Sequence, residues 1–515
     1  MGFFKKSKVK NAQKTKENSP ENRALSPSLS ENLDLLSERF GGSTDLIKRQ
    51  ITFFNNEKTK LLVIYLEGMV DKVLQDSILK SILMDDVATV TSNTAVGTLK
   101  DLLVTTSSVN EVTDIRTVSM HILSGDTVIL VDGQSYGISV NTKGGEHRGV
   151  QEPASQTVVR GSRESFTEKL PTNTALIRRI IKDPSLILES LTIGRTTHTQ
   201  VGIMYLKDVA NDKVLQEVRT RLNRIDLNGL VESGTLEEFI QDETYTPFPT
   251  IFNSERPDVI AAGLLEGRVA ILVDGSPFVL LVPALFIHFY QSPEDYTQRS
   301  DIATLIRILR FFSMCIAIFG PALYIGITTF HQEMLPTQLL ISLAAQREGI
   351  PFPALVEALM MEITFEILRE AGIRMPRTIG QTLSIVGALV IGQAAILAGI
   401  VSPSMVIVVS LTAIANFAIP SYNMSISLRM VRFIFMFLAA SFGLFGMIIG
   451  IFALVLHLTS LRSFGMPYMS PFGPFNLQDQ KDSIFRLPQW GLISRPRLIG
   501  NQQNMTRIDE NSRPK

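Results

Sequence analysis

The fold class is decided by the stretch Phe433-Ile-Phe-Met-Phe-Leu-Ala-Ala-Ser-Phe-Gly-Leu-Phe-Gly-Met-Ile-Ile-Gly-Ile-Phe-Ala-Leu-Val-Leu-His-Leu458, which contains no Asp, Glu, Lys or Arg. As an α-helix this stretch would be about 39 Å long. The hydrocarbon core of a bilayer is about 30 Å thick. Because buried helices of soluble proteins seldom run this long without charge, the stretch predicts a transmembrane helix.

Three further apolar segments precede it. Phe311–Phe330 is uncharged, and Pro321 within it predicts a kink. Gln381–Val401 predicts a second span, and Met405–Ile419 predicts a third, shorter one. With Phe433–Leu458 as the fourth, the sequence predicts an α-helical transmembrane bundle.

The segment Pro351–Gly372 is amphipathic and fits two placements. Its charged residues are Glu357, Glu362, Glu366, Arg369 and Glu370. All except Glu357 fall within roughly one 100° sector of a helical wheel. The helix therefore either lies in the membrane interface or stands in the membrane with this stripe facing protein or water.

The charged residues concentrate in the first 300 positions, where a pattern of strands and helices occurs twice. The repeated strings are Lys60–Leu66 and Val201–Leu206, then Asp71-Lys-Val-Leu-Gln and Asp212-Lys-Val-Leu-Gln, then Ile129-Leu-Val-Asp-Gly and Ile271-Leu-Val-Asp-Gly. Three matches in one order predict a duplicated α/β module. The fold class is therefore an α+β soluble region of two similar modules, followed by the helical bundle.

Composition shifts set the expected boundaries. The predicted parts are a disordered tail at 1–31, module 1 at 32–140, a linker at 141–174, module 2 at 175–300, the transmembrane domain at 301–460 and a poorly ordered cytoplasmic tail at 461–515. The basic N-terminus lacks the apolar region of a signal peptide, so we expect the soluble part to stay on the cytoplasmic side.

The sequence contains none of the common enzyme signatures. It has no Gly-rich phosphate loop, no nucleophile elbow and no histidine pair at metal-ligand spacing. The single cysteine, Cys315, excludes a disulfide framework within the chain. The formal net charge is zero, which gives no attraction to nucleic acid. We expect neither catalysis nor a cofactor.

Polar and small residues of the bundle are the candidate functional positions. The acidic stripe consists of Glu362, Glu366 and Glu370. Repeated around an oligomer axis, it would form a ring that attracts cations. The alternative is a helix that lies in the membrane interface with its carboxylates in water. Gln393 and Asn416 lie inside spans and should face a helix or a water path. Pairs of small residues four positions apart would let helices pack closely. These pairs are Ala388 and Gly392, Ala395 and Gly399, and Gly446 and Gly450.

From Leu33 to Pro474 the chain resembles the A subunits of spore germinant receptors, the GerA-type spore germination protein family. The motifs that carry the resemblance include Gln151-Glu152-Pro153, Arg160-Gly161-Ser162-Arg163-Glu164, Asn173-x-x-Leu-Ile-Arg-Arg, Glu255-Arg-Pro-Asp, Met361-Glu-Ile-Thr-Phe-Glu and Ser460-Leu-Arg-Ser-Phe-Gly-Met-Pro-Tyr. The family usually has Gly-Pro-Arg-Glu in the linker, so Ser162 is a departure that bears on the shape of this loop.

The resemblance implies a location and partners. Such subunits sit in the inner membrane of the dormant spore with a transporter-like B subunit and a lipoprotein C subunit. They are thought to form a homo-oligomeric ring around a cation pore that opens when a nutrient binds. Two alternatives stay open: a scaffold that conducts nothing, and a family member associated with the dipicolinic acid release channel.

Overall fold

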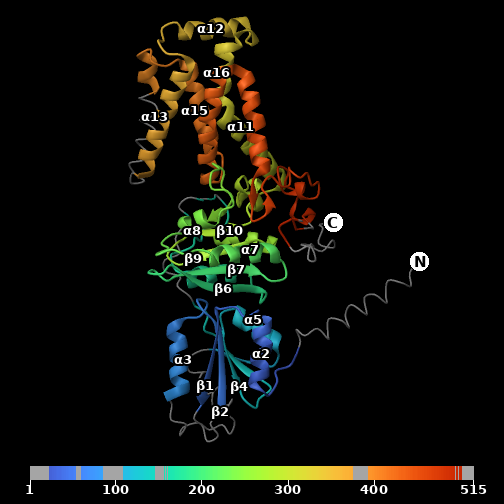
Figure 1. The fold of residues 1–515 in the computed structure, drawn as a ribbon. Coiled ribbons are helices and arrows are strands. Elements are labelled where there is room, and N and C mark those ends of the chain that lie inside the picture. Colours follow the sequence, from blue (N-terminus) through green and yellow to red (C-terminus); the bar gives the residue numbers. More distant parts are fainter. Residues whose placement is uncertain are drawn as a thin grey trace, which may run out of the picture.

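The structure is a computed structural model that describes residues 23–53, 59–84, 108–144, 153, 156, 158, 160–374, 392–492, 495–496 and 498–500. Three parts are stacked along one axis (Figure 1). Module 1 lies at one end, module 2 lies in the middle, and a bundle of long helices lies at the other end.

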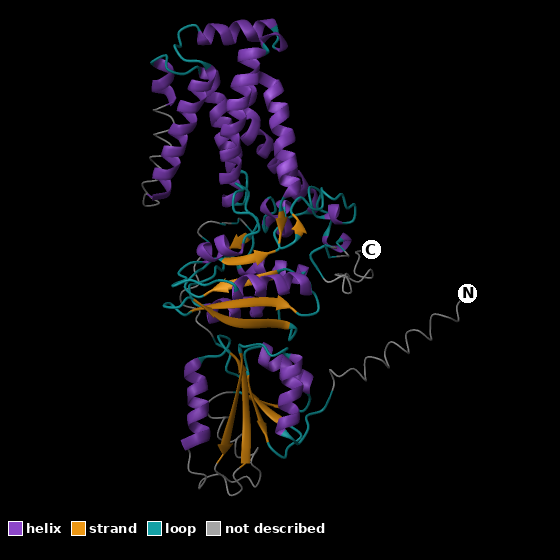
Figure 2. Cartoon of the chain, in the orientation of Figure 1, coloured by secondary structure: helices purple, strands orange, loops and turns teal. Residues whose placement is uncertain are grey.

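Module 1 is a five-stranded antiparallel sheet with helices on both faces (Figure 2). Its strand order is β1 (Leu46–Phe53), β2 (Thr59–Leu66), β4 (Thr127–Val131), β5 (Gly137–Val140) and β3 (Val109–Val112). Its helices are α2 (Leu29–Arg39), α3 (Lys72–Met84) and α5 (Ile115–Leu123). Leu62 and Ile64 of β2 pack with α2 and α5, whereas Leu61 and Val63 pack with α3. The uninterrupted apolar run of this strand is therefore explained by burial on both faces.

Module 2 repeats this arrangement. Its strand order is β6 (Leu186–Ile193), β7 (Thr199–Leu206), β9 (Val269–Val273), β10 (Val279–Val282) and β8 (Phe252–Ser254). Its helices are α6 (Leu170–Ile180), α7 (Asp212–Asn223), α8 (Ser233–Ile240) and α9 (Pro257–Glu266). The repeated strings occupy equivalent elements: Tyr65 and Tyr205 lie on β2 and β7, and both Leu-Val-Asp-Gly strings end the central strands β4 and β9. The shared strand order is what a duplication predicts.

A buried ion pair joins the two modules. Arg178 of α6 is fully buried, and its Nε and Nη2 donate to the two carboxylate oxygens of Asp45 at 2.5 and 2.8 Å. The backbone amide of Thr44 donates to the carbonyl of Leu188, which also links the end of module 1 to strand β6. Because Arg178 belongs to the motif that begins at Asn173, this family motif lies at the module interface.

The bundle contains α11 (Ser300–Phe330), α12 (Thr337–Arg347), α13 (Ala354–Arg374), α15 (Pro403–Phe417) and α16 (Tyr422–Ser460). Helix α11 rises from module 2, and α12 lies across the far end of the bundle (Figure 1). Short 3-10 turns (Phe286–Phe289, Gln332–Met334, Asp479–Lys481 and Gln489–Gly491), the helix α10 (Glu294–Thr297) and the hairpin β11 (Arg462–Ser463) and β12 (Met466–Pro467) complete the described elements.

Helix α16 is a helical hairpin with two antiparallel arms. Gly443 has φ 60° and ψ −144°, which no helix accommodates. Ser427, before this glycine, hydrogen-bonds the carbonyl of Pro247, and His457, after it, lies 2.8 Å from the hydroxyl of Thr246. A straight helix would separate these two residues by about 45 Å. The first arm (422–442) and the second arm (444–460) therefore begin and end at the same level, beside module 2.

By length and hydropathy, α11 and the whole of α16 qualify as candidate membrane spans. The turn at Gly443 divides α16 into two arms, so the prediction that Phe433–Leu458 forms one span is wrong. Helix α15 has 15 residues, about 22 Å as a helix, which is shorter than the hydrocarbon core. Most of the predicted second span, from Gln381 to residue 391, lies outside the described residues. The four predicted spans are thus only partly represented among the described elements.

Three predicted boundaries are wrong. Residues 23–31 are ordered, because Leu25 and Leu29 pack into the core of module 1. Helix α6 begins at Leu170, inside the predicted linker. Residues 461–492 fold back onto module 2 and the base of α11, so this part of the predicted tail is not poorly ordered. In the tail, Tyr468 is completely buried, and its carbonyl accepts from the amide of Phe286.

Candidate functional site

The candidate pore residues of α13 face the first arm of α16. Glu362 Oε2 accepts from Arg432 Nη1 at 2.5 Å, and both side chains are 2% exposed. Arg432 Nε also donates to the carbonyl of Ala317 on α11 at 2.6 Å. One buried ion pair therefore ties three helices together near the middle of the bundle.

A second carboxylate lies one turn further along α13. Glu366 pairs with Arg429 of the first arm and with Arg369 of its own helix, the latter at 3.0 Å. The guanidinium of Arg369 also lies 5.6 Å from the ring centre of Phe417 on α15. Three guanidinium groups thus face two carboxylates. We name Glu362, Glu366, Arg369, Arg429 and Arg432 the charge cluster.

The charge cluster decides between the two placements of the predicted acidic stripe. A charge buried without a partner costs several kcal/mol, so charged residues in a bundle pair with each other. Glu362, Glu366 and Arg369 of the stripe face other helices, whereas Glu370 is exposed. The described α13 runs along the bundle instead of lying flat at its edge (Figure 1). Arginines of the same chain pair with Glu362 and Glu366, and a ring of these carboxylates around an oligomer axis stays a prediction.

The other candidate pore residues lie apart from the cluster. Glu370 is exposed and pairs with Arg374 at 2.6 Å. Gln393 is exposed. Asn416 is buried at the end of α15 and donates from Nδ2 to the hydroxyl of Ser425 at 2.8 Å, which joins α15 to α16. Asn416 thus makes an interhelical hydrogen bond.

The basic half of this site was not among the residues predicted from the sequence. Arg429 and Arg432 are the only Lys or Arg residues between Gln381 and Ser460. Such rare intramembrane charges usually have a partner of opposite sign, and the four carboxylates of the preceding segment were the available partners. Glu357 was also missed: its Oε2 accepts from the amide and the hydroxyl of Ser402, both at 2.8 Å.

The glycines predicted to allow close packing lie at different contacts. Gly446 and Gly450 face the first arm of their own hairpin, where a Cβ on Gly450 would come within 2.8 Å of Leu438 and Phe435. Gly392 faces Val406 of α15, and Gly399 lies near the carbonyl of Gly349. These described contacts are within the chain, and packing against a second copy stays a prediction.

The linker motif docks on module 2. Gln151 and Glu152 lie outside the described residues, and Pro153 is buried. Arg256 of the Glu255-Arg-Pro-Asp motif is completely buried and donates to the carbonyls of Gln156 and Ser162 at 3.0 and 2.9 Å. The carbonyl of Arg160 accepts from the hydroxyl of Thr297 at 3.0 Å. Arg163 and Glu164 of the same motif are exposed.

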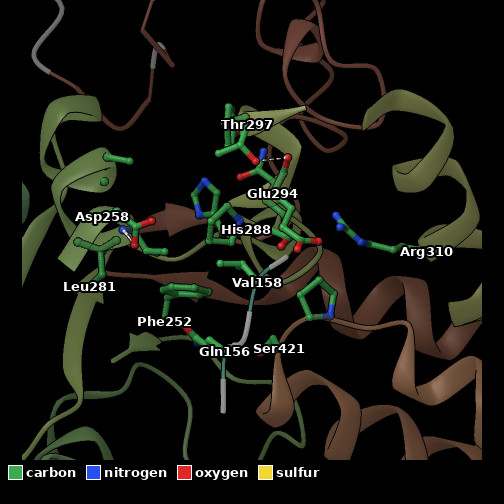
Figure 3. A pocket seen from close by; sticks show the side chains of 18 of the residues that line it. Gln156, Val158, Phe252, Asp258, Leu281, His288, Glu294, Thr297, Arg310 and Ser421 are labelled. Carbon is green, nitrogen blue, oxygen red and sulfur yellow. Dashed lines mark hydrogen bonds between the residues drawn. The ribbon is translucent and has the colours of Figure 1, made fainter. Parts of the chain in front are cut away.

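This docked segment borders a cavity of about 550 Å³ between module 2 and the base of the bundle (Figure 3). Its walls come from the linker, α9, β10, the stretch that precedes α11, and the turn between α15 and α16. Labelled lining residues include Gln156, Phe252, Asp258, His288, Glu294 and Ser421. Burial, followed by the nearby positive charge of Arg268, lowers the pKa of His288, which is therefore neutral.

A smaller cavity of about 330 Å³ adjoins it and shares Gln156, Pro420 and Ser421. It is lined by Glu232 and Glu237 from the start of α8 and by Tyr422 from the start of α16. Burial raises the pKa of Glu237 to about 7. Both cavities lie where module 2 meets the bundle. The interface between these two parts is therefore incompletely packed.

The family model described as Bacillus/Clostridium GerA spore germination protein matches residues 34–498. The chain belongs to this family. The resemblance that the motifs indicated is therefore confirmed, and it extends through both modules, the bundle and the C-terminal segment.

Individual relatives agree. The chain is 47% identical to spore germination protein KA of Bacillus subtilis, over 95% of this chain and 90% of that one. It is 39% identical to spore germination protein GerLA of Bacillus cereus, over 94% of this chain and 98% of that one. Among solved structures it matches the N-terminal domain of the A subunit of the Bacillus megaterium spore germinant receptor GerK3, with 41% identity, 52% of this chain and 98% of that chain covered, and a TM-score of 0.41.

Proposed function

We propose that this GerA-family chain is the membrane A subunit of a nutrient-responsive germinant receptor in the inner membrane of the spore. The observation that carries the proposal is that one alignment with a spore germination protein covers 95% of the chain, from the soluble modules through the bundle. In this proposal the chain works with a transporter-like B subunit and a lipoprotein C subunit. Its soluble modules face the cytoplasm.

Topology follows from the hairpin. Both arms of α16 end beside module 2, so the C-terminal segment lies on the same side of the bundle as the modules. Arg299, Arg307 and Arg310 cluster at that end, as the positive-inside rule requires of a cytoplasmic face. Single cysteines in the Cys315→Ser background test this: Ser342→Cys on α12 should react with an impermeant maleimide from outside, and Gln478→Cys should not. The reverse pattern would contradict the proposal.

The finer mechanism that we propose is an oligomeric pore for monovalent cations. The charge cluster is satisfied within one subunit, so the proposed path runs between subunits and not through α13 and α16. Glu370 and Gln393 are the candidate lining residues, since both are exposed. Glu362 and Glu366 then hold the bundle together.

Flux measurements separate these roles. The receptor is reconstituted in liposomes with its partner subunits, and nutrient-triggered K⁺ efflux is recorded. Glu370→Gln and Gln393→Ala should change cation selectivity or conductance in properly assembled protein, whereas Glu362→Gln should lower the yield of folded subunit. Unaltered flux in both Glu370→Gln and Gln393→Ala would remove these residues from the path.

A scaffold that conducts nothing is the second candidate. The buried Arg178–Asp45 pair joins the two modules, which suits an assembly surface. Cross-linking in the membrane distinguishes the candidates, because a strictly monomeric chain cannot form a ring.

A partner of the dipicolinic acid channel is the third candidate function. Loss of the chain would then slow the release of dipicolinic acid without changing the response to a particular nutrient.

A further inference from the structure

The C-terminal segment, residues 466–492, exposes an unusual number of large apolar side chains. They are Phe475 (72% exposed), Leu477 (75%), Phe485 (60%), Leu487 (38%) and Trp490 (42%). An exposed apolar surface of this kind marks an interaction site. The segment is not loosely attached, so these side chains are presented from a fixed position.

Three contacts fix the segment to α11. The ring of Phe472 meets that of Phe311 edge-on, with 6.3 Å between ring centres. Arg307 donates to the side chain and the carbonyl of Asp482 at 2.9 and 3.0 Å. The amide of Arg486 donates to the hydroxyl of Thr304 at 3.1 Å.

These contacts also fix the depth of the segment. Measured along α11 from its far end at Phe330, Phe311 lies at about 28 Å and Thr304 at about 39 Å. The hydrocarbon core is about 30 Å thick, and the bilayer with its headgroups about 40–45 Å. If α11 crosses the membrane with Phe330 at the far edge of the hydrocarbon core, the contacts at Phe311 and Thr304 run from the near edge of that core to the outer side of the headgroup layer that faces the modules.

The surface of α11 at this level is apolar too. Leu305, Leu309 and Phe312 are 68%, 59% and 65% exposed. They continue the lipid-facing surface of the span without a polar break. The segment itself projects sideways from the base of the bundle (red in Figure 1), so it extends beneath the lipid that surrounds the helices.

We propose that residues 475–490 form an interfacial membrane anchor that rests in the boundary between headgroups and acyl chains. Aromatic side chains favour this layer because their rings are apolar at one end and polar at the other. The occupant is lipid, because the contacts with Thr304, Arg307 and Phe311 hold these apolar side chains at the level of the membrane surface. The anchor would hold the base of α11 and module 2 at a set distance from the membrane. It goes beyond the proposed function and requires only that α11 crosses a bilayer.

Trp490 is the single tryptophan of the chain, so its fluorescence reports on this segment alone. The full-length protein is reconstituted in liposomes of ordinary phosphatidylcholine or of phosphatidylcholine brominated near the top of the acyl chains. Two single-tryptophan controls in the Trp490→Phe background bracket the result: Phe312→Trp on the lipid-facing side of α11, and Val73→Trp on α3 of module 1.

Brominated lipid should quench Trp490 about as strongly as the Phe312→Trp control, and aqueous iodide should quench it far less than the Val73→Trp control. Strong quenching by iodide with none by brominated lipid would show that the segment faces water, which overturns the proposal. Protection from both quenchers would show that protein covers the surface, as a second copy of the chain would, and this also overturns it.

Discussion

At the scale of single residues, the buried pair Glu362–Arg432 has the largest energetic consequence. Replacing Arg432 with Leu leaves a carboxylate buried without its partner, which destabilises a protein by about 3–5 kcal/mol. The Glu362→Leu/Arg432→Leu double variant removes both charges and should recover most of that loss. Thermal unfolding of the full-length chain in detergent measures both effects. If the single and double variants are equally unstable, the unpaired carboxylate of Glu362 is not the cause of the destabilisation.

Glu237 predicts a pH dependence. Its folded-state pKa is raised to about 7 from the usual 4.5, because burial disfavours the ionised form. The folded state therefore binds the proton more tightly, and the stability that this provides is complete below about pH 4.5 and is lost as the pH rises through about 7. Glu237→Gln should raise stability by about 1–3 kcal/mol at pH 8 and have little effect at pH 4.5.

The free energy of unfolding of the Glu237→Gln variant, measured at both pH values, checks this. Glu238→Gln is the control, because the side chain of Glu238 is exposed. An equal gain at both pH values would mean that the carboxyl group ionises normally. The smaller cavity beside Glu237 would then be better hydrated than its lining suggests.

At the scale of elements, the turn of α16 depends on Gly443. Its φ of 60° favours glycine, and a Cβ there would lie 2.7–2.9 Å from His331 and Phe330 at the end of α11. Gly443→Val should destabilise the bundle by more than about 1 kcal/mol through backbone strain and this overlap. The matched control is Gly234→Ala, where the added Cβ has no neighbour within 4 Å.

Cysteine cross-linking checks the hairpin itself. Phe435 and Gly450 are adjacent across the two arms, whereas a continuous helix would place them about 22 Å apart. In the Cys315→Ser background, Phe435→Cys/Gly450→Cys should form a disulfide under mild oxidation, and Phe435→Cys/Leu458→Cys should not. Failure of the first pair in folded protein would argue for one long helix.

At the scale of the whole molecule, the Arg178–Asp45 pair holds module 1 against module 2. Arg178→Leu leaves Asp45 buried without its partner, which should cost about 3–5 kcal/mol and loosen the modules. We expect faster cleavage between the modules in limited proteolysis. The control is Arg195→Leu, which breaks the exposed pair with Asp226 and should change stability by less than about 1 kcal/mol.

Much of this architecture was predictable from local patterns. The apolar stretch Phe433–Leu458 indicated the helical part of the fold, because apolar length and the absence of charge are properties of a single segment, but it did not indicate the turn at Gly443. The repeated Leu-Val-Asp-Gly strings indicated two modules because a duplicated core needs the same strand and turn twice. Buried Leu25 and the folded segment after Leu461 were missed, since their polar neighbours resemble disordered chain and their ordering comes from distant partners.

The sequence by itself determined the apolar helical part, the paired modules and the family, because each rests on residues that are close in the chain or on motifs in a fixed order. Only the tertiary structure decided that Phe433–Leu458 is split between two arms at Gly443, and that the acidic stripe of α13 is paired with arginines. Both depend on contacts between residues far apart in sequence. The reach of a carboxylate to a guanidinium is set by helix packing, which no local pattern of residues specifies.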